Sequence, residues 1–278
     1  MEDQVDPPII REKNIFTSKI LQVSLLQMNS NRFFIEFSYA GTAYHGWQRQ
    51  PNAESIQAYM EEAFSTLLKQ QIPITAAGRT DAGVHAKLMV AHFDAAISAD
   101  ACDQLVFRLN QYLPNDIAIQ KIYDVKADAH ARFDALSRTY EYHLTTTKSP
   151  FSEGRSYSLY QPLDFELMNK AAALLLEYKD FECFSKAHTD VKTFLCKISH
   201  ATWTNSEKGY TFTITANRFL RNMVRAIVGT LVEIGLKKKK VEDLHQIIKN
   251  KNRSEAGYSV PAQGLFLTRI EYPKNIYL

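Results

Sequence analysis

The sequence predicts an α+β fold in which two similar halves join their mainly antiparallel sheets, carry helices on one face and leave a cleft between them. The first half reads as strand, helix, strand, helix, strand, strand, the order of a split α+β sandwich. The second half has a similar order, although no sequence repeat is obvious. Aromatic residues make up 12% of the 278 residues, and this abundance favours strands.

The elements of the first half follow from hydrophobic periodicity and turn residues. Apolar and polar side chains alternate over Phe33–Tyr39, which predicts a strand. After a loop at 41–51, apolar residues recur at helical spacing over 56–68. Asn52 or Ser55 can cap this helix. The remaining elements of this half are a glycine-bracketed loop at 78–83, strands at 90–93, 117–125 and 139–144, and a helix at 99–113.

The second half is read in the same way. A proline opens a helix at Pro162, and strong alternation marks a strand at 210–216. The other elements expected here are a strand at 196–203, a long helix at 219–234 that ends at Gly235, a helix at 241–250 and a closing strand at 265–272.

A stretch near 149–157 that is rich in serine, proline and glycine predicts the boundary between the halves. We therefore expect an N-terminal extension at 1–31, a subdomain at 32–150 that carries the Asp81 loop, and a C-terminal subdomain at 151–278 that completes the cleft. The extension has acidic residues ahead of its apolar stretch, opposite to a secretory signal.

The spacing of the cysteines and the length of the apolar runs indicate the cellular compartment. Cys102, Cys183 and Cys196 are scattered and form no CxxC pair, so neither a disulfide framework nor a zinc site is expected. A reducing cytoplasm is the simplest compartment. No apolar run reaches transmembrane length, so no membrane association is expected.

The formal net charge of +3 is too small to indicate a nucleic-acid partner by itself. Basic residues nevertheless cluster locally, at Arg218, Arg221 and Arg225, at 237–240, and at Lys249, Lys251 and Arg253. For the lysine run at 237–240 alone, a solvated face is the favoured interpretation. The sequence contains no P-loop, dinucleotide fingerprint or GxSxG elbow.

The strongest candidate for chemistry is Asp81, in the run AGRTDAGVHA at 77–86. Small residues on both sides of this carboxylate let a ligand or another backbone approach closely. Arg79 and Thr80 supply donors beside it. The alternative is a turn in which Asp81 caps local amides, and the residues alone leave the two about equal.

Two further residues stand out, each with an ordinary alternative. Arg225 lies among apolar neighbours and shares a helical face with Arg221, so in a cleft it would need Asp81 or a phosphate as partner. On the surface it would bind backbone phosphate or nothing. Tyr140 projects from a strand and is more simply a core tyrosine. His45, His85 and His92 lack the close pairing of a zinc site.

At this point the chain resembles the tRNA pseudouridine synthase A family. The run GRTDAGVH at 78–85 is similar to that family's active-site signature. The resemblance extends from Arg32 to Pro273 through motifs in the family's order. They are YAGTAYHGWQRQ at 39–50, NQYLPNDI at 110–117, HARF at 130–133, RTYEY at 138–142, DF at 180–181, FLRNMVRAIVG at 219–229 and PAQGLFL at 261–267.

The resemblance implies the pseudouridine synthase fold, built from ferredoxin-like subdomains, and a homodimer that needs no cofactor or metal. It implies modification of uridines 38, 39 and 40 in the anticodon stem-loop of tRNA. It assigns Asp81 as the catalytic nucleophile, Tyr140 as the residue stacking on the target base and Arg225 as the partner of Asp81. Leu265 matches a residue lining the base pocket. Candidate RNA contacts are Arg49, Arg79, Arg221 and the lysine run.

The chain departs from the family pattern at three positions outside that site. Ala129 stands where phenylalanine is common, Lys179 where histidine is common and Cys196 where arginine is frequent. These changes bear on RNA contacts and local packing.

The isomerisation that the resemblance implies can be carried out with a single carboxylate. An ionised Asp81 could trap C1′ of uridine covalently or remove a sugar proton to give a glycal, and the sequence does not choose. Three rivals stay open. They are a synthase with another RNA target, an idle RNA-binding module on the same scaffold, and a metabolic enzyme that uses an Asp–Arg pair.

Overall fold

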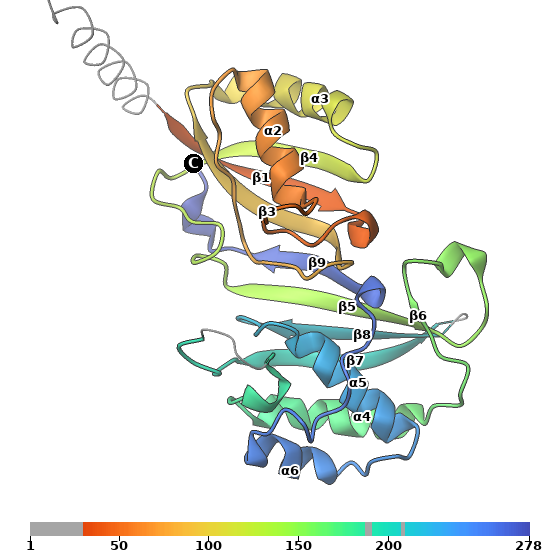
Figure 1. Ribbon diagram of the computed structural model, residues 1–278. Coiled ribbons are helices and arrows are strands. Elements are labelled where there is room, and N and C mark those ends of the chain that lie inside the picture. The colour runs from red at the N-terminus through yellow and green to blue at the C-terminus, as the bar shows by residue number, and fades with distance from the viewer. Residues whose placement is uncertain (1–29, 187–190, 207–208) are drawn as a thin grey trace, which may run out of the picture.

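The computed structural model describes residues 30–186, 191–206 and 209–278. The predicted N-terminal extension lies almost wholly outside the described residues. One sheet of nine strands runs through the molecule in the order β4-β1-β3-β9-β5-β8-β7, with β2 beside β3 and β6 beside β5 (Figure 1). Its strands are β1 Asn31–Tyr39, β2 Thr75–Ala76, β3 His85–Ala95, β4 Ile117–Val125, β5 Ser137–Thr145, β6 Tyr157–Ser158, β7 Ile198–Ser206, β8 Gly209–Ala216 and β9 Leu265–Glu271.

Five α-helices accompany the sheet in the described residues. In Figure 1, α2 and α3 lie beside β1, β3 and β4, whereas α4, α5 and α6 lie beside β7 and β8. The helices are α2 Ile56–Leu68, α3 Cys102–Tyr112, α4 Phe165–Leu174, α5 Met223–Gly235 and α6 Asp243–Asn250. The predicted α+β class with a large, mainly antiparallel sheet is confirmed.

The last strand joins the two halves. β9 pairs in parallel with β3, where His85 lies opposite Phe266, and antiparallel with β5, where Tyr142 lies opposite Leu265. The expected edge-to-edge junction is therefore made through a strand from the C-terminal end of the chain. The strands that carry Tyr140 and Leu265 are thereby fixed by backbone hydrogen bonds, as is β3, which follows the Asp81 loop.

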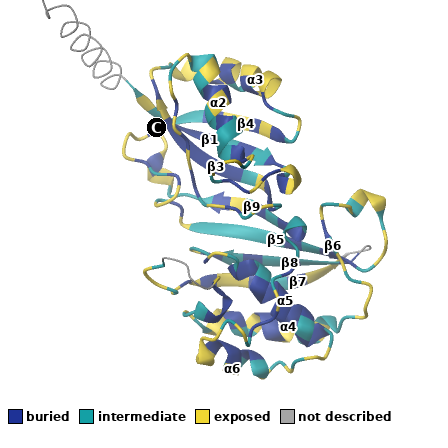
Figure 2. Ribbon diagram, in the orientation of Figure 1, coloured by how far each residue is buried: buried dark blue, intermediate teal, exposed yellow. Residues whose placement is uncertain are grey.

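The core consists of two apolar clusters, and Figure 2 shows the buried strands between exposed outer surfaces. One cluster centres on β1, β3, α2 and α3, with fully buried Phe33, Phe34 and Phe64. The other centres on β8, α4 and α5, with fully buried Trp203 and Phe212. Each cluster covers one end of the sheet, so the two halves meet at the middle of the sheet.

Local signals explain where the helices begin. The Ser55 hydroxyl accepts a hydrogen bond from the Ala58 N–H at 3.4 Å, so Ser55 is the cap of α2. Asp164 caps α4 through the Leu167 N–H, two residues after the predicted opening at Pro162. The predicted start of the long helix at 219 is wrong. Asn222 has a left-handed φ of 66°, which ends helical geometry there, so α5 begins at Met223.

A buried histidine on β3 is neutral in the folded protein. His92 Nδ1 accepts the Ala131 N–H at 3.2 Å, so the ring proton sits on Nε2. Burial first, and then the charge of Arg32, lower the pKa of His92 to about 4. The unfolded chain therefore binds a proton at this residue at a higher pH than the folded chain does.

We expect the free energy of unfolding to fall as the pH drops from about 6.5 to 4, with His92 contributing up to about 3 kcal/mol. His92→Asn keeps an acceptor for Ala131 but does not titrate, so its pH dependence should be flatter. Urea denaturation at pH 7 and pH 4.5 measures this. Exposed His45 provides the control His45→Gln. Equal pH slopes for His92→Asn and wild type would contradict the prediction.

Candidate active site

The Asp81 loop connects β2 to β3 and is held by the loop at 41–51. The Trp47 N–H donates to the Thr80 carbonyl at 3.2 Å, and the Gly83 N–H donates to the Tyr44 carbonyl at 3.3 Å. The Thr80 hydroxyl is buried and lies 2.8 Å from the hydroxyl of Tyr39. These contacts fix the backbone on both sides of Asp81.

Glycine makes this close approach possible. Gly46 has a φ of +91°, and a Cβ there would lie 2.3 Å from the Thr80 carbonyl oxygen. Both the backbone angle and the space therefore require glycine. The sequence showed glycines in this loop, but their contact partner comes from the tertiary structure.

The Asp81 carboxylate faces two arginines from the second half of the chain. Arg221 Nε lies 3.5 Å from Oδ1, and Arg225 Nη1 lies 3.9 Å from Oδ2. Among the described residues no backbone amide donates to this carboxylate, so the alternative of a local cap is not what the structure contains. The side chain of Asp81 is 28% exposed and that of Arg225 is 20% exposed, whereas Arg221 is 60% exposed.

The two arginines that face Asp81 lie in different elements: Arg221 is in the segment before α5, and Arg225 is in α5 itself. The prediction that they share one helical face is wrong, because Arg221 precedes the helix that contains Arg225. Arg225 is oriented by its own hydrogen bond from Nε to the Val260 carbonyl at 2.7 Å. That carbonyl belongs to a segment held by Ser259, which accepts from Asn222 at 2.5 Å and from Arg253 at 3.0 Å.

Tyr140 lies on β5 at the junction of the two cores and is partly buried. Its ring meets Phe219 edge-on, with centroids 5.2 Å apart. Burial raises the pKa of Tyr140 to about 12, and the charge of Asp81 adds to this while Arg138 opposes it. Tyr140 is therefore neutral at physiological pH and lies within the electrostatic reach of Asp81.

The remaining predicted binding residues are distributed differently. Leu265 is buried at the start of β9, opposite Tyr142 in the strand register. Arg79 is exposed on the Asp81 loop. Arg49 instead pairs with Glu61 of α2 at 3.2 Å.

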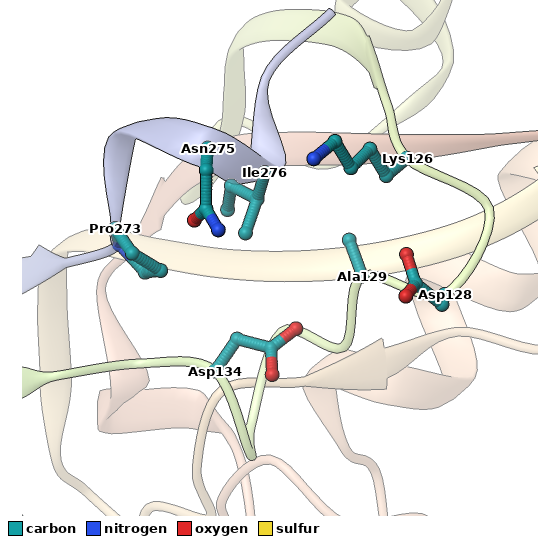
Figure 3. A pocket seen from close by; sticks show the side chains of 7 residues that line it. All are labelled: Lys126, Asp128, Ala129, Asp134, Pro273, Asn275 and Ile276. Atoms are coloured by element: carbon teal, nitrogen blue, oxygen red, sulfur yellow. The ribbon is translucent and has the colours of Figure 1, made fainter.

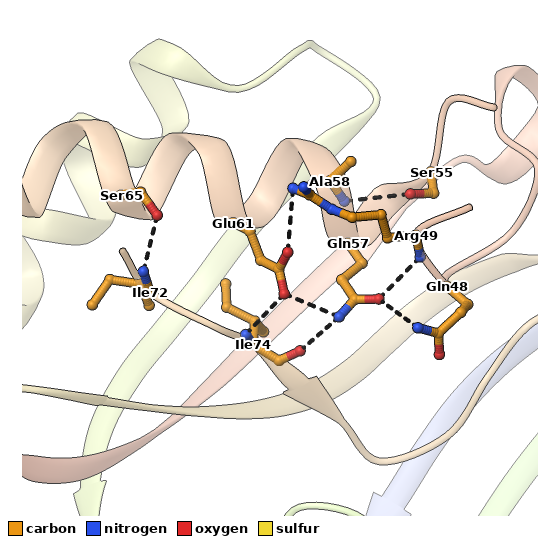
Figure 4. A network of polar contacts seen from close by, with 9 residues as sticks. All are labelled: Gln48, Arg49, Ser55, Gln57, Ala58, Glu61, Ser65, Ile72 and Ile74. Atoms are coloured by element: carbon orange, nitrogen blue, oxygen red, sulfur yellow. Dashed lines mark hydrogen bonds and ion pairs between the residues drawn. The ribbon is translucent and has the colours of Figure 1, made fainter. Parts of the chain in front are cut away.

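Figure 4 shows the polar network around Arg49. Gln57 Oε1 accepts the Arg49 N–H at 3.0 Å and Gln48 Nε2 at 3.2 Å, while Glu61 accepts the Ile74 N–H at 3.2 Å. These bonds tie the 41–51 loop to α2. Arg49 is thus engaged in holding the loop that supports Asp81.

Two further residues support the site, and the sequence did not indicate this role for either of them. Arg138 donates to the carbonyls of Ala77, Arg132, Ala135 and Asn217 at 2.6–3.0 Å. It thereby ties the start of the Asp81 loop to the end of β8. Arg138 lies two residues before Tyr140 on the same strand, and this position alone does not indicate that its side chain binds four carbonyls.

The other supporting residue is His85. Its Nδ1 accepts the Gly41 N–H at 3.1 Å, and its Nε2–H donates to the Gly154 carbonyl at 3.0 Å. Burial lowers the pKa of His85, which keeps the ring neutral in this bridge. The residue joins both halves of the chain beside the Asp81 loop.

Across residues 30–186, 191–206 and 209–278, no three His, Cys, Asp or Glu side chains gather to hold a metal ion. Of the helices in these same ranges, none combines the length and the apolar character needed to cross a membrane.

A hollow of about 230 Å³ lies elsewhere in the molecule, lined by Lys126, Asp128, Ala129, Asp134, Pro273, Asn275 and Ile276 (Figure 3). Lys126 follows β4 at the end of the sheet where Arg32 pairs with Val125, and Asp81 precedes the opposite end of β3. Lys126 is therefore about 30 Å from Asp81 along the strand direction. This hollow is not part of the Asp81 site.

Comparison with known proteins identifies the family. The family model described as tRNA pseudouridine synthase matches residues 36–134 and 171–273. The chain belongs to the tRNA pseudouridine synthase family. Asp81 lies in the first matched segment of this pseudouridine synthase, Arg225 and Leu265 lie in the second, and Tyr140 lies between them.

Individual relatives agree over nearly their whole length. A protein of Porphyromonas gingivalis named tRNA pseudouridine synthase A is 54% identical over 250 residues, covering 89% of this chain and 99% of the relative. Its namesake in Bacteroides fragilis is 53% identical over 251 residues, covering 90% and 100%. One from Acetivibrio thermocellus is 37% identical over 247 residues, covering 88% and 100%. The pseudouridine synthase resemblance drawn from the motifs is confirmed.

Proposed function

We propose that this protein isomerises uridine to pseudouridine at positions 38, 39 and 40 of the tRNA anticodon stem-loop, with Asp81 as the nucleophile and without a cofactor. The observation that carries the proposal is one carboxylate between two arginines beside a neutral, partly buried tyrosine. Family membership supplies the class of reaction, and this geometry supplies groups suited to it.

The reaction exchanges a C–N bond for a C–C bond at one sugar carbon. In the first route, Asp81 attacks C1′, the N1–C1′ bond breaks, and the uracil leaves as an anion. The base then turns, its C5 attacks C1′, and the carboxylate leaves. Loss of the C5 proton and protonation of N1 complete the balance. In the second route, Asp81 removes the C2′ proton as the N1–C1′ bond breaks, which gives a glycal and a uracil anion. C5 then adds to C1′ while the proton returns to C2′, and loss of the C5 proton and protonation of N1 again complete the balance.

A lone carboxylate favours isomerisation over hydrolysis. Glycosidases pair two carboxyl groups so that one can activate water. In the described part of this chain, Arg221 and Arg225 form ion pairs with Asp81 and with no second carboxylate. The ionised carboxylate is the form that can attack C1′.

Tyr140 would hold the detached uracil by stacking and could assist proton transfer from C5 through its hydroxyl. Tyr140→Phe keeps the ring and removes only the hydroxyl, whereas Tyr140→Ala removes both. Because a base–aromatic stack contributes about 1–3 kcal/mol, we expect Tyr140→Ala to reduce kcat/KM by roughly 5- to 150-fold beyond any effect of Tyr140→Phe. Single-turnover rates measure both variants. Full turnover in Tyr140→Phe would remove the hydroxyl role, and full turnover in Tyr140→Ala would remove both.

The two arginines are expected to act differently. Arg225 is mostly buried and hydrogen-bonded, so Arg225→Gln should reduce kcat by about 10²–10³-fold. Arg221 is largely exposed, so Arg221→Gln should mainly weaken RNA binding and lower the salt dependence of Kd by about one unit of slope.

The two variants act as controls for each other, since each removes one cation from the same carboxylate. Turnover and filter binding at several salt concentrations separate their effects. A larger loss of kcat in Arg221→Gln than in Arg225→Gln would reverse the assignment.

The substrate must bring its uridine to a site built into the protein, so the base would leave its stack on binding. Affinity would come mostly from phosphate contacts and fall with salt. Exposed Arg79 and Arg221 are the candidates nearest Asp81, and the lysine run at 237–240 is a further one. We also propose that the protein works as a homodimer in the cytoplasm.

The proposal is tested by incubating unmodified tRNA with the protein and mapping pseudouridine by position. Formation at 38, 39 and 40 is the expected result. Pseudouridine confined to other positions or other RNAs would favour the rival target. Tight tRNA binding without any pseudouridine would favour the idle binding module, and failure to bind tRNA would favour a metabolic enzyme.

A further inference from the structure

A large aromatic side chain stands exposed in the loop between β4 and β5. Phe133 is 74% exposed, and Leu136 three residues later is 58% exposed. The guanidinium of Arg132, itself exposed, lies over the Phe133 ring at 5.8 Å, and the His130 ring packs against the ring at 4.3 Å. An exposed aromatic ring flanked by a cation presents two groups that stack on nucleobases.

The loop that carries Phe133 is rigidly held. His130 Nδ1 accepts the N–H groups of Arg132 and Phe133 at 3.1 and 3.4 Å. The Ala131 carbonyl accepts the Tyr272 hydroxyl at 2.5 Å. Because these bonds fix the backbone, the ring is presented without the entropy cost of ordering a loop on binding. A mobile phenylalanine that merely lacks a place in the core would not be held in this way.

The loop also abuts the Asp81 loop. Arg138 Nη2 donates to the Arg132 carbonyl at 2.6 Å and to the Ala77 carbonyl at 3.0 Å, so these oxygens lie within about 6 Å of each other. Ala77 precedes Asp81 by four residues, a span of at most about 14 Å. An RNA that places a uridine at Asp81 therefore has neighbouring nucleotides within reach of Phe133.

The charges around the ring fit an anionic partner. Arg132, Arg138 and Arg218 lie close enough for Arg132 and Arg218 to lower the pKa of Arg138, after the larger effect of burial. The acids in this loop are Asp128 and Asp134, and Asp134 accepts the His130 N–H at 2.7 Å. The three arginines outnumber these two acids, as expected for a surface that receives a phosphate backbone.

We propose that Phe133, with Arg132 beside it, stacks on an unpaired nucleobase of the RNA substrate other than the reacting uridine. This inference rests on the proposed function, because it takes the substrate to be RNA. The contact would bind and orient the RNA, and it would take no part in bond breaking. Its loss should therefore raise KM and leave kcat at saturating RNA unchanged.

Four variants test the proposal with unmodified tRNA. Phe133→Ala should raise KM and Kd about tenfold. Phe133→Leu keeps an apolar side chain without a π-face and should behave like Phe133→Ala, whereas Phe133→Trp should bind within about twofold of wild type. Phe107 is also exposed, at 66%, but lies on α3, so Phe107→Ala is the matched control and should change nothing.

Phe133→Trp also supplies a direct signal. The natural tryptophans, Trp47 and Trp203, are buried, so an exposed Trp at 133 should dominate quenching when tRNA binds. Unquenched fluorescence at saturating tRNA, or wild-type Kd in Phe133→Ala, would overturn the proposal. So would wild-type Kd in Phe133→Leu, since a plain hydrophobic contact would then suffice. Dissociation of an oligomer in Phe133→Ala would assign the ring to a contact between copies and also overturn it.

Failure of this inference is distinguishable from failure of the proposed function. Pseudouridine formation by the wild-type protein tests the reaction, whereas the binding series tests Phe133. Wild-type turnover with unaltered Kd in Phe133→Ala would reject the stacking contact alone. Absence of pseudouridine in the wild-type protein would reject the proposed function, whatever the variants bind.

Discussion

Asp81→Asn is expected to lower kcat by at least about 10⁴-fold while tRNA still binds. Asparagine has nearly the same shape as aspartate, but it carries no charge with which to attack C1′ or to take a sugar proton. The nearest cations, Arg221 and Arg225, remain in place, and the charge they face becomes neutral. Pseudouridine mapping under single-turnover conditions and filter binding of tRNA give the two readouts.

Asp94→Asn is the matched control for this variant. Asp94 is also paired with an arginine, since Arg32 Nε lies 2.8 Å from its Oδ1, but it lies at the other end of β3. We expect it to leave kcat unchanged. Turnover by Asp81→Asn at more than a tenth of the wild-type rate would show that another group performs the chemistry.

Gly46→Ala is expected to lower both stability and turnover, although it adds no charge and removes no functional group. A methyl group at this position would lie 2.3 Å from the Thr80 carbonyl oxygen, and the φ of +91° disfavours any residue with a side chain. We expect a loss of about 2 kcal/mol or more in the free energy of unfolding. Because the clash falls on the residue before Asp81, kcat should also fall by about 10²-fold through displacement of the carboxylate.

Gly78→Ala distinguishes this effect from a general intolerance of substitution near Asp81. Gly78 is the first residue of the GRTDAGVH motif that contains Asp81, but a Cβ at Gly78 would meet nothing within 4 Å. Its unfolding midpoint in urea and its kcat should both stay close to wild type. Equal losses of stability and kcat in the two variants would mean that the close contact between Gly46 and the Thr80 carbonyl is not what positions Asp81.

Much of the fold followed from local patterns, and the errors have physical causes. The strand at 33–39 and the helix at 56–68 were found because their periodicity and capping residues are contained in adjacent sequence. The start of the long helix was misplaced because Asn222 adopts a left-handed conformation that composition does not reveal. The strand predicted at 90–93 was too short, because β3 begins at His85, inside the motif that was read as a loop.

The candidate site shows the same division. Asp81 and its glycines were visible as a motif, as was Arg225 among apolar residues. The role of Arg138 was not visible, because its four carbonyl acceptors come from three separate parts of the chain. Arg49 remains a candidate RNA contact, and only the fold shows that it also pairs with Glu61 of α2.

The sequence by itself determined the α+β class, most of the helices and strands, and the family, because periodicity and ordered motifs are properties of neighbouring residues. Only the tertiary structure decided that β9 joins the two halves, that Gly46 packs on Thr80, and that two arginines from the second half meet Asp81. Those contacts link residues far apart in the chain. They depend on strand register and on which side chains the packed core leaves at the junction, and no local pattern encodes either.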